Sequence, residues 1–262
     1  MLTLCIIMKG RRTMKTIKNN IKYIIFLATF GLIGGYFVTL YSIQTLNKEL
    51  LDEVIVQAGS LDLVILVSTI QSLIYTIVFG LFGKTLAKKI GLWREISFKQ
   101  NENIELILCL LVSGIAFILI DYCIFGQFLA PVKELYLTKP TIECIIASIT
   151  YGAVTEEILL RLFAMSLIVV IFKRLFKCEE NNDKILIISN IISSIIFAAL
   201  HLPATYLTFG EINILILFRC FLMNGAFGLL FGRLYRKYGI YYAMIAHAGL
   251  HIVSKLIWLL FI

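Results

Sequence analysis

The sequence predicts an all-α integral membrane protein that crosses the bilayer about seven times, or eight times if its longest apolar stretch divides. Of its 262 residues, 60% are hydrophobic and 15% are charged. The mean hydropathy is +0.93. A soluble domain of this size cannot bury so much apolar surface, because its interior grows too slowly with chain length. A lipid bilayer is the solvent that accommodates this composition.

Seven apolar stretches are long enough to cross the hydrocarbon core, which takes about 20 helical residues. They are residues 23–46, 61–83, 104–128, 141–172, 185–203, 212–232 and 240–262. The fourth stretch is long, and its first part, residues 141–150, is typical of an interfacial or tilted lead-in. No internal repeat or long linker divides the chain. We therefore predict a basic N-terminal segment, residues 1–22, and a single transmembrane domain, residues 23–262.

Lysine and arginine are concentrated in alternate loops. Eighteen lie in the N-terminal segment and in every second loop, whereas the opposite loops hold three. Because basic loops stay on the cytoplasmic side, we predict a multi-pass protein of the cell membrane with a cytoplasmic N-terminus and an outer C-terminus. The net charge of +8 then reflects topology and attraction to anionic membrane lipid, and no nucleic-acid partner is expected.

Three charged residues inside the predicted spans have simple explanations. Lys255 lies near the outer end of the last span, where its ammonium group can reach the interface. Arg219 can do the same or find a carboxylate. Asp121 is near the outer end of the third span, where we expect an interfacial role.

The fourth stretch contains a denser cluster, Glu156, Glu157 and Arg161. Ionisable groups in hydrocarbon cost several kcal/mol unless they are paired or face a cavity. Glu157 and Arg161 are four residues apart on one helical face, so they can form an ion pair. Glu156 points about 100° away and stays outside that pair. Taken alone, the cluster is explained as well by a structural ion pair with a spare acid as by a catalytic site.

All three histidines, His201, His247 and His251, fall in or at the ends of apolar stretches. His247 and His251 are four residues apart, so their imidazoles share one helical face. The pair is not an H-E-x-x-H motif, because Ala248 stands where the glutamate would be. A general base must therefore come from another helix, and Glu156 is the available one.

These residues resemble the three motifs of the CPBP family of intramembrane metalloproteases, which includes CAAX prenyl endopeptidases and bacteriocin-processing and immunity proteins. The first motif, E-E-x-x-x-R, matches Glu156 to Arg161, and the second, F-x-x-x-H, matches Phe197 to His201. The third, H-x-x-x-N, matches His247 but has His251 in place of asparagine. The resemblance covers about residues 140–255, the expected protease-like core.

The resemblance implies helices that enclose an intramembrane catalytic cavity. It implies that Glu156 and His201 activate a water molecule, and that Glu157 and Arg161 form a supporting pair. His247 and residue 251 would stabilise the oxyanion. A carboxylate in an apolar medium is suited to act as a base near neutral pH.

The customary label of metalloprotease leaves two chemistries open. Either Zn²⁺ is held by Glu156, His201, His247 and His251, or the water is activated without a metal. The replacement of asparagine bears on the oxyanion donor, because a neutral imidazole donates through one N–H only. His251 is therefore a substitute donor, a metal ligand, or a sign that activity has been lost.

The leading hypothesis is an intramembrane endopeptidase that cleaves a small hydrophobic or lipid-modified peptide. CAAX-type processing and maturation of a bacteriocin or signal peptide are both compatible with it. One alternative is bacteriocin self-immunity or peptide binding without proteolysis. A second is a metal or proton transporter, against which the sequence shows no polar trail along several helices.

Overall fold

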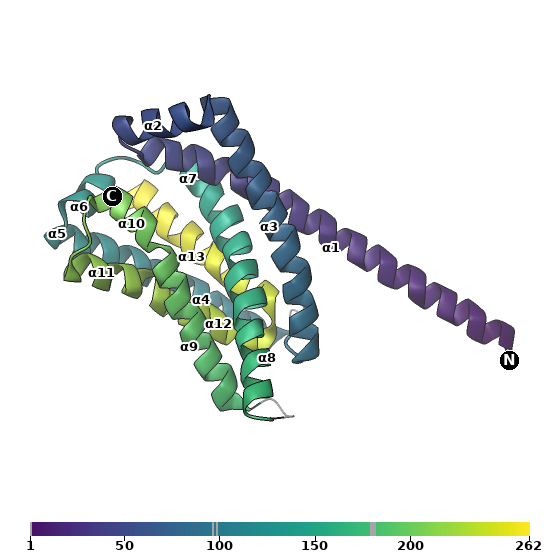
Figure 1. Ribbon diagram of the computed structural model, residues 1–262. Coiled ribbons are helices and arrows are strands. Elements are labelled where there is room, and N and C mark those ends of the chain that lie inside the picture. Colours follow the sequence, from purple (N-terminus) through teal and green to yellow (C-terminus); the bar gives the residue numbers. More distant parts are fainter. Residues whose placement is uncertain (1, 96, 98, 179–181) are drawn as a thin grey trace.

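The computed structural model describes residues 2–95, 97, 99–178 and 182–262, and every regular element in these ranges is a helix (Figure 1). The α-helices are α1 (Leu2–Thr45), α2 (Lys48–Ala58), α3 (Leu61–Lys89), α4 (Gln100–Ile118), α5 (Gly126–Phe128), α6 (Ala130–Leu135), α7 (Ile142–Ala147), α8 (Ser166–Leu175), α9 (Asp183–Leu200), α10 (Leu202–Phe209), α11 (Ile214–Cys220), α12 (Phe227–Tyr238) and α13 (Ile240–Phe261). Four π-helical segments join them: η1 (Leu119–Phe125), η2 (Ser148–Glu156), η3 (Ile158–Met165) and η4 (Phe221–Ala226).

Six helices in the described ranges are long and apolar enough to cross a membrane, which supports a multi-pass membrane protein. They are Asn19–Thr45, Leu61–Lys89, Gln100–Phe128, Asp183–Phe209, Ile214–Tyr238 and Ile240–Phe261. These six confirm six of the seven predicted stretches. The fourth stretch is helical too, but Glu156, Glu157 and Arg161 interrupt its apolar run, and it is not among the six.

The fourth stretch forms the central column of the bundle. Segments α7, η2, η3 and α8 follow one another without a break from Ile142 to Leu175 (Figure 1). The column contacts α1 and α3 on one side and α9 and α13 on others. The two glutamates therefore lie where several helices meet.

Glycines allow the outer helices to approach one another closely. A Cβ at Gly35 of α1 would lie 2.5 Å from Cβ of Ser72 in α3. A Cβ at Gly114 of α4 would lie 2.5 Å from Cβ of Val253 in α13. Small residues at crossings are typical of membrane helices, whose association depends on close packing rather than on the hydrophobic effect.

Asp121, for which an interfacial role is expected, is buried within the protein. Arg219 donates to its two carboxylate oxygens at 2.7 and 2.8 Å, and the hydroxyl of Tyr136 donates at 3.0 Å. Arg219 has thus found a carboxylate, one of its two expected outcomes. Two opposite charges in bidentate contact neutralise each other, and they hold η1 against α11.

Candidate functional site

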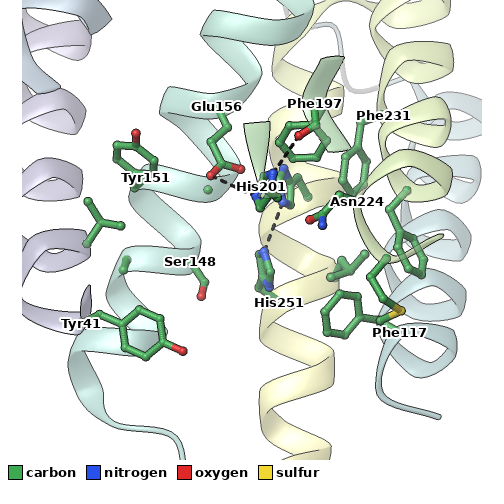
Figure 2. Close-up of a pocket in the computed structure, with 17 residues that line it drawn as sticks. Tyr41, Phe117, Ser148, Tyr151, Glu156, Phe197, His201, Asn224, Phe231 and His251 are labelled. Carbon is green, nitrogen blue, oxygen red and sulfur yellow. Dashed lines mark hydrogen bonds and ion pairs between the residues drawn. The ribbon is translucent and has the colours of Figure 1, made fainter. Parts of the chain in front are cut away.

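Glu156 and His201 face each other across a pocket between the helices (Figure 2). Glu156 ends η2, and His201 lies at the junction where α9 ends and α10 begins with Pro203 in its first turn. Nε2 of His201 is 3.9 Å from Oε1 of Glu156, too far for a direct hydrogen bond. The two side chains are 30% and 18% exposed, so both are reachable from the pocket.

The backbone fixes the tautomer of His201. Its Nδ1 lies 2.8 Å from the carbonyl oxygen of Phe197, one turn earlier in α9. Because a carbonyl can only accept, Nδ1 carries the hydrogen and donates it. In the neutral ring, Nε2 therefore presents a lone pair toward Glu156. Two acceptors thus face each other across a gap that suits a water molecule donating to both.

Glu157 and Arg161 form the ion pair that their spacing predicts. Nε of Arg161 is 3.5 Å from Oε2 of Glu157, and both side chains are fully buried. The guanidinium group also lies over the ring of Phe197, 4.5 Å from its centre. Gly228 makes room for it, since a Cβ there would be 2.7 Å from Nη2 of Arg161. As predicted, Glu156 is outside this pair and turns toward the pocket.

His247 and His251 continue the polar chain from Glu157 toward the pocket. Nδ1 of His247 donates to Oε1 of Glu157 at 3.0 Å. In a neutral ring this leaves Nε2 of His247 as an acceptor, and Nε2 of His251 lies 3.2 Å from it. His251 then carries the N–H between the two rings. His251, which stands where the family motif has asparagine, is therefore hydrogen-bonded to His247, which matches the motif.

All four predicted catalytic residues line one pocket of about 270 Å³, whereas Glu157 and Arg161 lie behind it. Most of the other lining residues are apolar or aromatic. Further lining residues not predicted from the sequence include Tyr41, Phe117, Ser148, Tyr151, Gly152 and Asn224. Asn224, whose Nδ2 donates to the Cys220 carbonyl at 2.9 Å, is a polar residue inside the sixth predicted stretch, a signal that could have identified it. Gly152 carries no such signal.

Buried polar side chains continue from the ion pair along one helix, α9. Ser194 lies against Gly228, the glycine that borders Arg161, and its hydroxyl donates to Asn190 at 3.4 Å. Asn190 in turn donates to the Leu229 carbonyl at 2.9 Å. Asn190 and Ser194 are four residues apart and therefore share one face of α9.

The four residues do not form the tetrahedral zinc site that the metalloprotease label implies. Within the described ranges, no group of three or more histidine, cysteine, aspartate or glutamate side chains is arranged to hold a metal ion. Zinc ligands direct their lone pairs at one centre. Here His247 and His251 are turned toward each other, and Glu156 and His201 form a separate pair. This donor set does not fit Zn²⁺, and the steps proposed below use the side chains alone.

The helices and the pocket define a class of protein, namely a multi-pass membrane protein with a carboxylate and three histidines gathered inside the bundle. Residues 138–253 match the family model of Rce1-like type II CAAX prenyl endopeptidases. The chain thus carries a domain of this family, over nearly the range in which the motifs resemble it. No curated protein and no solved structure matches the chain.

Proposed function

We propose that the protein is an intramembrane endopeptidase that hydrolyses a peptide bond in a small hydrophobic or lipid-modified peptide. The single observation that carries this proposal is the opposed pair of acceptors, Oε1 of Glu156 and Nε2 of His201, 3.9 Å apart in an otherwise largely apolar pocket. A water molecule between them donates one hydrogen to each, which directs its lone pair outward to a substrate carbonyl. Family membership supports the same reaction.

The reaction uses Glu156 as the general base. Glu156 takes a proton from the water as the water oxygen bonds to the carbonyl carbon, and His201 orients that water. The carbonyl becomes a tetrahedral oxyanion, which accepts the N–H of His251 as its ring turns from His247. Glu156 then gives the proton to the leaving nitrogen, and the C–N bond breaks. The products are a carboxylic acid and an amine.

Glu157 and Arg161 have a supporting role in this proposal. Glu157 holds the Nδ1–H of His247 and thereby keeps Nε2 of that ring as an acceptor. The N–H of His251 consequently donates to that ring until a substrate oxyanion replaces it. Arg161 balances the buried charge of Glu157, so the supporting layer adds little net charge to the pocket.

The same proposal includes the topology. The column from α7 to α8, fourth in chain order, brings the number of membrane crossings to seven. The N-terminus is cytoplasmic and the C-terminus lies outside. The outer faces of the helices contact membrane lipid. The ends of α3 and α8 and the starts of α9 and α13 lie toward one end of the bundle, whereas α2, α10 and the C-terminus lie toward the other (Figure 1). The loops at the first end are the basic ones, which supports this orientation.

The proposal is tested by Glu156→Gln in purified protein reconstituted into liposomes. The probes are a farnesylated reporter peptide ending in Cys-aliphatic-aliphatic-X and an unprenylated hydrophobic leader peptide. We expect Glu156→Gln to lower kcat at least about 10²-fold, because the base is lost. Glu143→Gln is the control, since Glu143 is in the first turn of α7 and does not line the pocket. A fully active Glu156→Gln protein overturns the proposal.

Peptide binding without hydrolysis, as in bacteriocin self-immunity, is the second candidate. The observation that favours it is His251, which replaces the third-motif asparagine and is tied to His247. If this candidate holds, cells that carry Glu156→Ala keep their resistance in an immunity assay. If the protein is a peptidase whose activity confers resistance, they lose it.

A further inference from the structure

We infer that the backbone of the scissile peptide is seated over Gly152, in the gap between the carboxylate of Glu156 and the imidazole of His251. Gly152 is then a specificity-determining residue, because the absence of a side chain at this position admits the substrate backbone. The inference rests on the proposed peptidase function and names the place where the reacting bond lies.

The surroundings of Gly152 are those of a substrate seat. Gly152 lies one turn before Glu156 in η2 and lines the pocket. A Cβ at Gly152 would have as its nearest neighbours Nε2 of His251 at 3.6 Å and Oε2 of Glu156 at 3.9 Å. Any side chain at this position would therefore stand between the base and the N–H donor. Figure 2 shows Glu156 and His251 reaching into the pocket from different helices.

Packing between helices does not require a glycine at this position. At Gly35, Gly114 and Gly249, a Cβ would come within 2.5 Å of a neighbouring helix, so these glycines are needed for close crossing. At Gly152, the same Cβ would make only ordinary van der Waals contacts. Alanine is also the better helix former. Stability alone would therefore favour alanine at position 152, and the space over Gly152 is better explained by a peptide that enters it.

This position of the peptide agrees with the steps of the proposed reaction. A carbonyl over Gly152 has the Glu156–His201 water beside its carbon, and the N–H of His251 reaches its oxygen once that ring has turned from His247. An extended peptide backbone is the kind of ligand that approaches a glycine closely. The π-helical widening of η2, a local feature often found at functional sites, lies on this same segment.

The matched control is Gly225, which lies in another π-helical segment, η4, and does not line the pocket. Its Cβ would be 3.7 Å from Cβ of Ala198 and 3.8 Å from the Ser194 carbonyl, nearly the same clearance as at Gly152. We therefore expect Gly152→Ala and Gly225→Ala to fold equally well. We expect kcat/KM for the reporter peptide to fall on the order of 10²-fold in Gly152→Ala only. Gly152→Val should lower kcat/KM more than Gly152→Ala does, because its side chain is larger.

A second measurement does not depend on a substitution at Gly152. The reporter peptide with a diazirine side chain at its scissile position is bound to the full-length Glu156→Gln protein, irradiated, and digested. We expect the crosslink within residues 148–156. A crosslink confined to other helices overturns the inference, even if Gly152→Ala fails to fold.

The outcomes separate this inference from the function on which it rests. If Glu156→Gln is inactive while Gly152→Ala is as active as Gly225→Ala, the seat over Gly152 is wrong and the peptidase proposal stands. If Glu156→Gln remains fully active, the peptidase proposal itself fails. Loss of activity in Gly152→Ala and a crosslink within residues 148–156 support the inference together.

Discussion

Removal of the buried carboxylate of Glu157 should destabilise the protein far more than removal of an accessible one. Glu157 and Arg161 are both fully buried, with Nε and Oε2 3.5 Å apart. Among the described residues, Nη1 and Nη2 of Arg161 have no hydrogen-bond partner, so Glu157 is its main source of charge compensation. Glu157→Gln leaves a buried cation, and breaking such a pair costs about 3–5 kcal/mol of unfolding free energy.

The double variant Glu157→Gln/Arg161→Met sharpens this prediction. It removes both charges, so the unfolding free energy that it loses should be well below the sum lost by the two single variants. The coupling between the two positions should be about 1–3 kcal/mol. The unfolding free energy is measured by SDS titration in mixed micelles. Glu105→Gln is the control, because Glu105 pairs with Arg233 and Lys237, whose side chains are about half exposed. Exposed pairs contribute about 0–1 kcal/mol. A Glu157→Gln protein as stable as Glu105→Gln, or additive single losses, would refute the buried-pair reasoning.

Three further predictions follow from the site and its surroundings. His251→Asn keeps an N–H donor at this position and should retain activity within about tenfold, whereas His251→Phe should lose about 10²-fold or more; equal kcat values in the two variants would contradict the donor role. Asp121→Asn should lower the unfolding free energy by about 2–4 kcal/mol, since it leaves Arg219 without its partner, while kcat of the folded fraction stays unchanged. Treatment with 1,10-phenanthroline should leave peptidase activity intact, and a loss that added Zn²⁺ restores would contradict the ligand arrangement.

The parts of the site that could be predicted from the sequence are those set by spacing along one helix. Glu157 and Arg161 are four residues apart, and the backbone brings residues at that interval onto one face whatever the rest of the fold does. The same spacing unites His247 and His251. The separation of Glu156 from the ion pair follows from the helical rotation per residue. The membrane helices followed from apolar length, and six of them are confirmed.

The remaining parts depend on which helices become neighbours, and this information is not local. Asp121 and Arg219 are 98 residues apart in sequence, and neither shows by itself that the other is its partner. The 3.9 Å approach of Glu156 and His201 depends on how η2 and α9 pack. Gly152 was overlooked for a different reason, because a glycine in an apolar helix looks like any packing glycine until its neighbours are known.

The adjacent glutamates offer the clearest way to separate chemistry from structure at this site. Glu156 is 18% exposed in its side chain and lines the pocket, whereas Glu157 is fully buried behind it. Glu156→Gln should therefore abolish kcat with little change in unfolding free energy. Glu157→Gln should lower the unfolding free energy first and affect kcat through His247. If both variants lost activity and stability in the same proportion, the two carboxylates would share one structural role. We expect opposite patterns for the two variants. Glu156 is open to the pocket and can reach a substrate, whereas Glu157 is buried, is compensated by Arg161 and cannot.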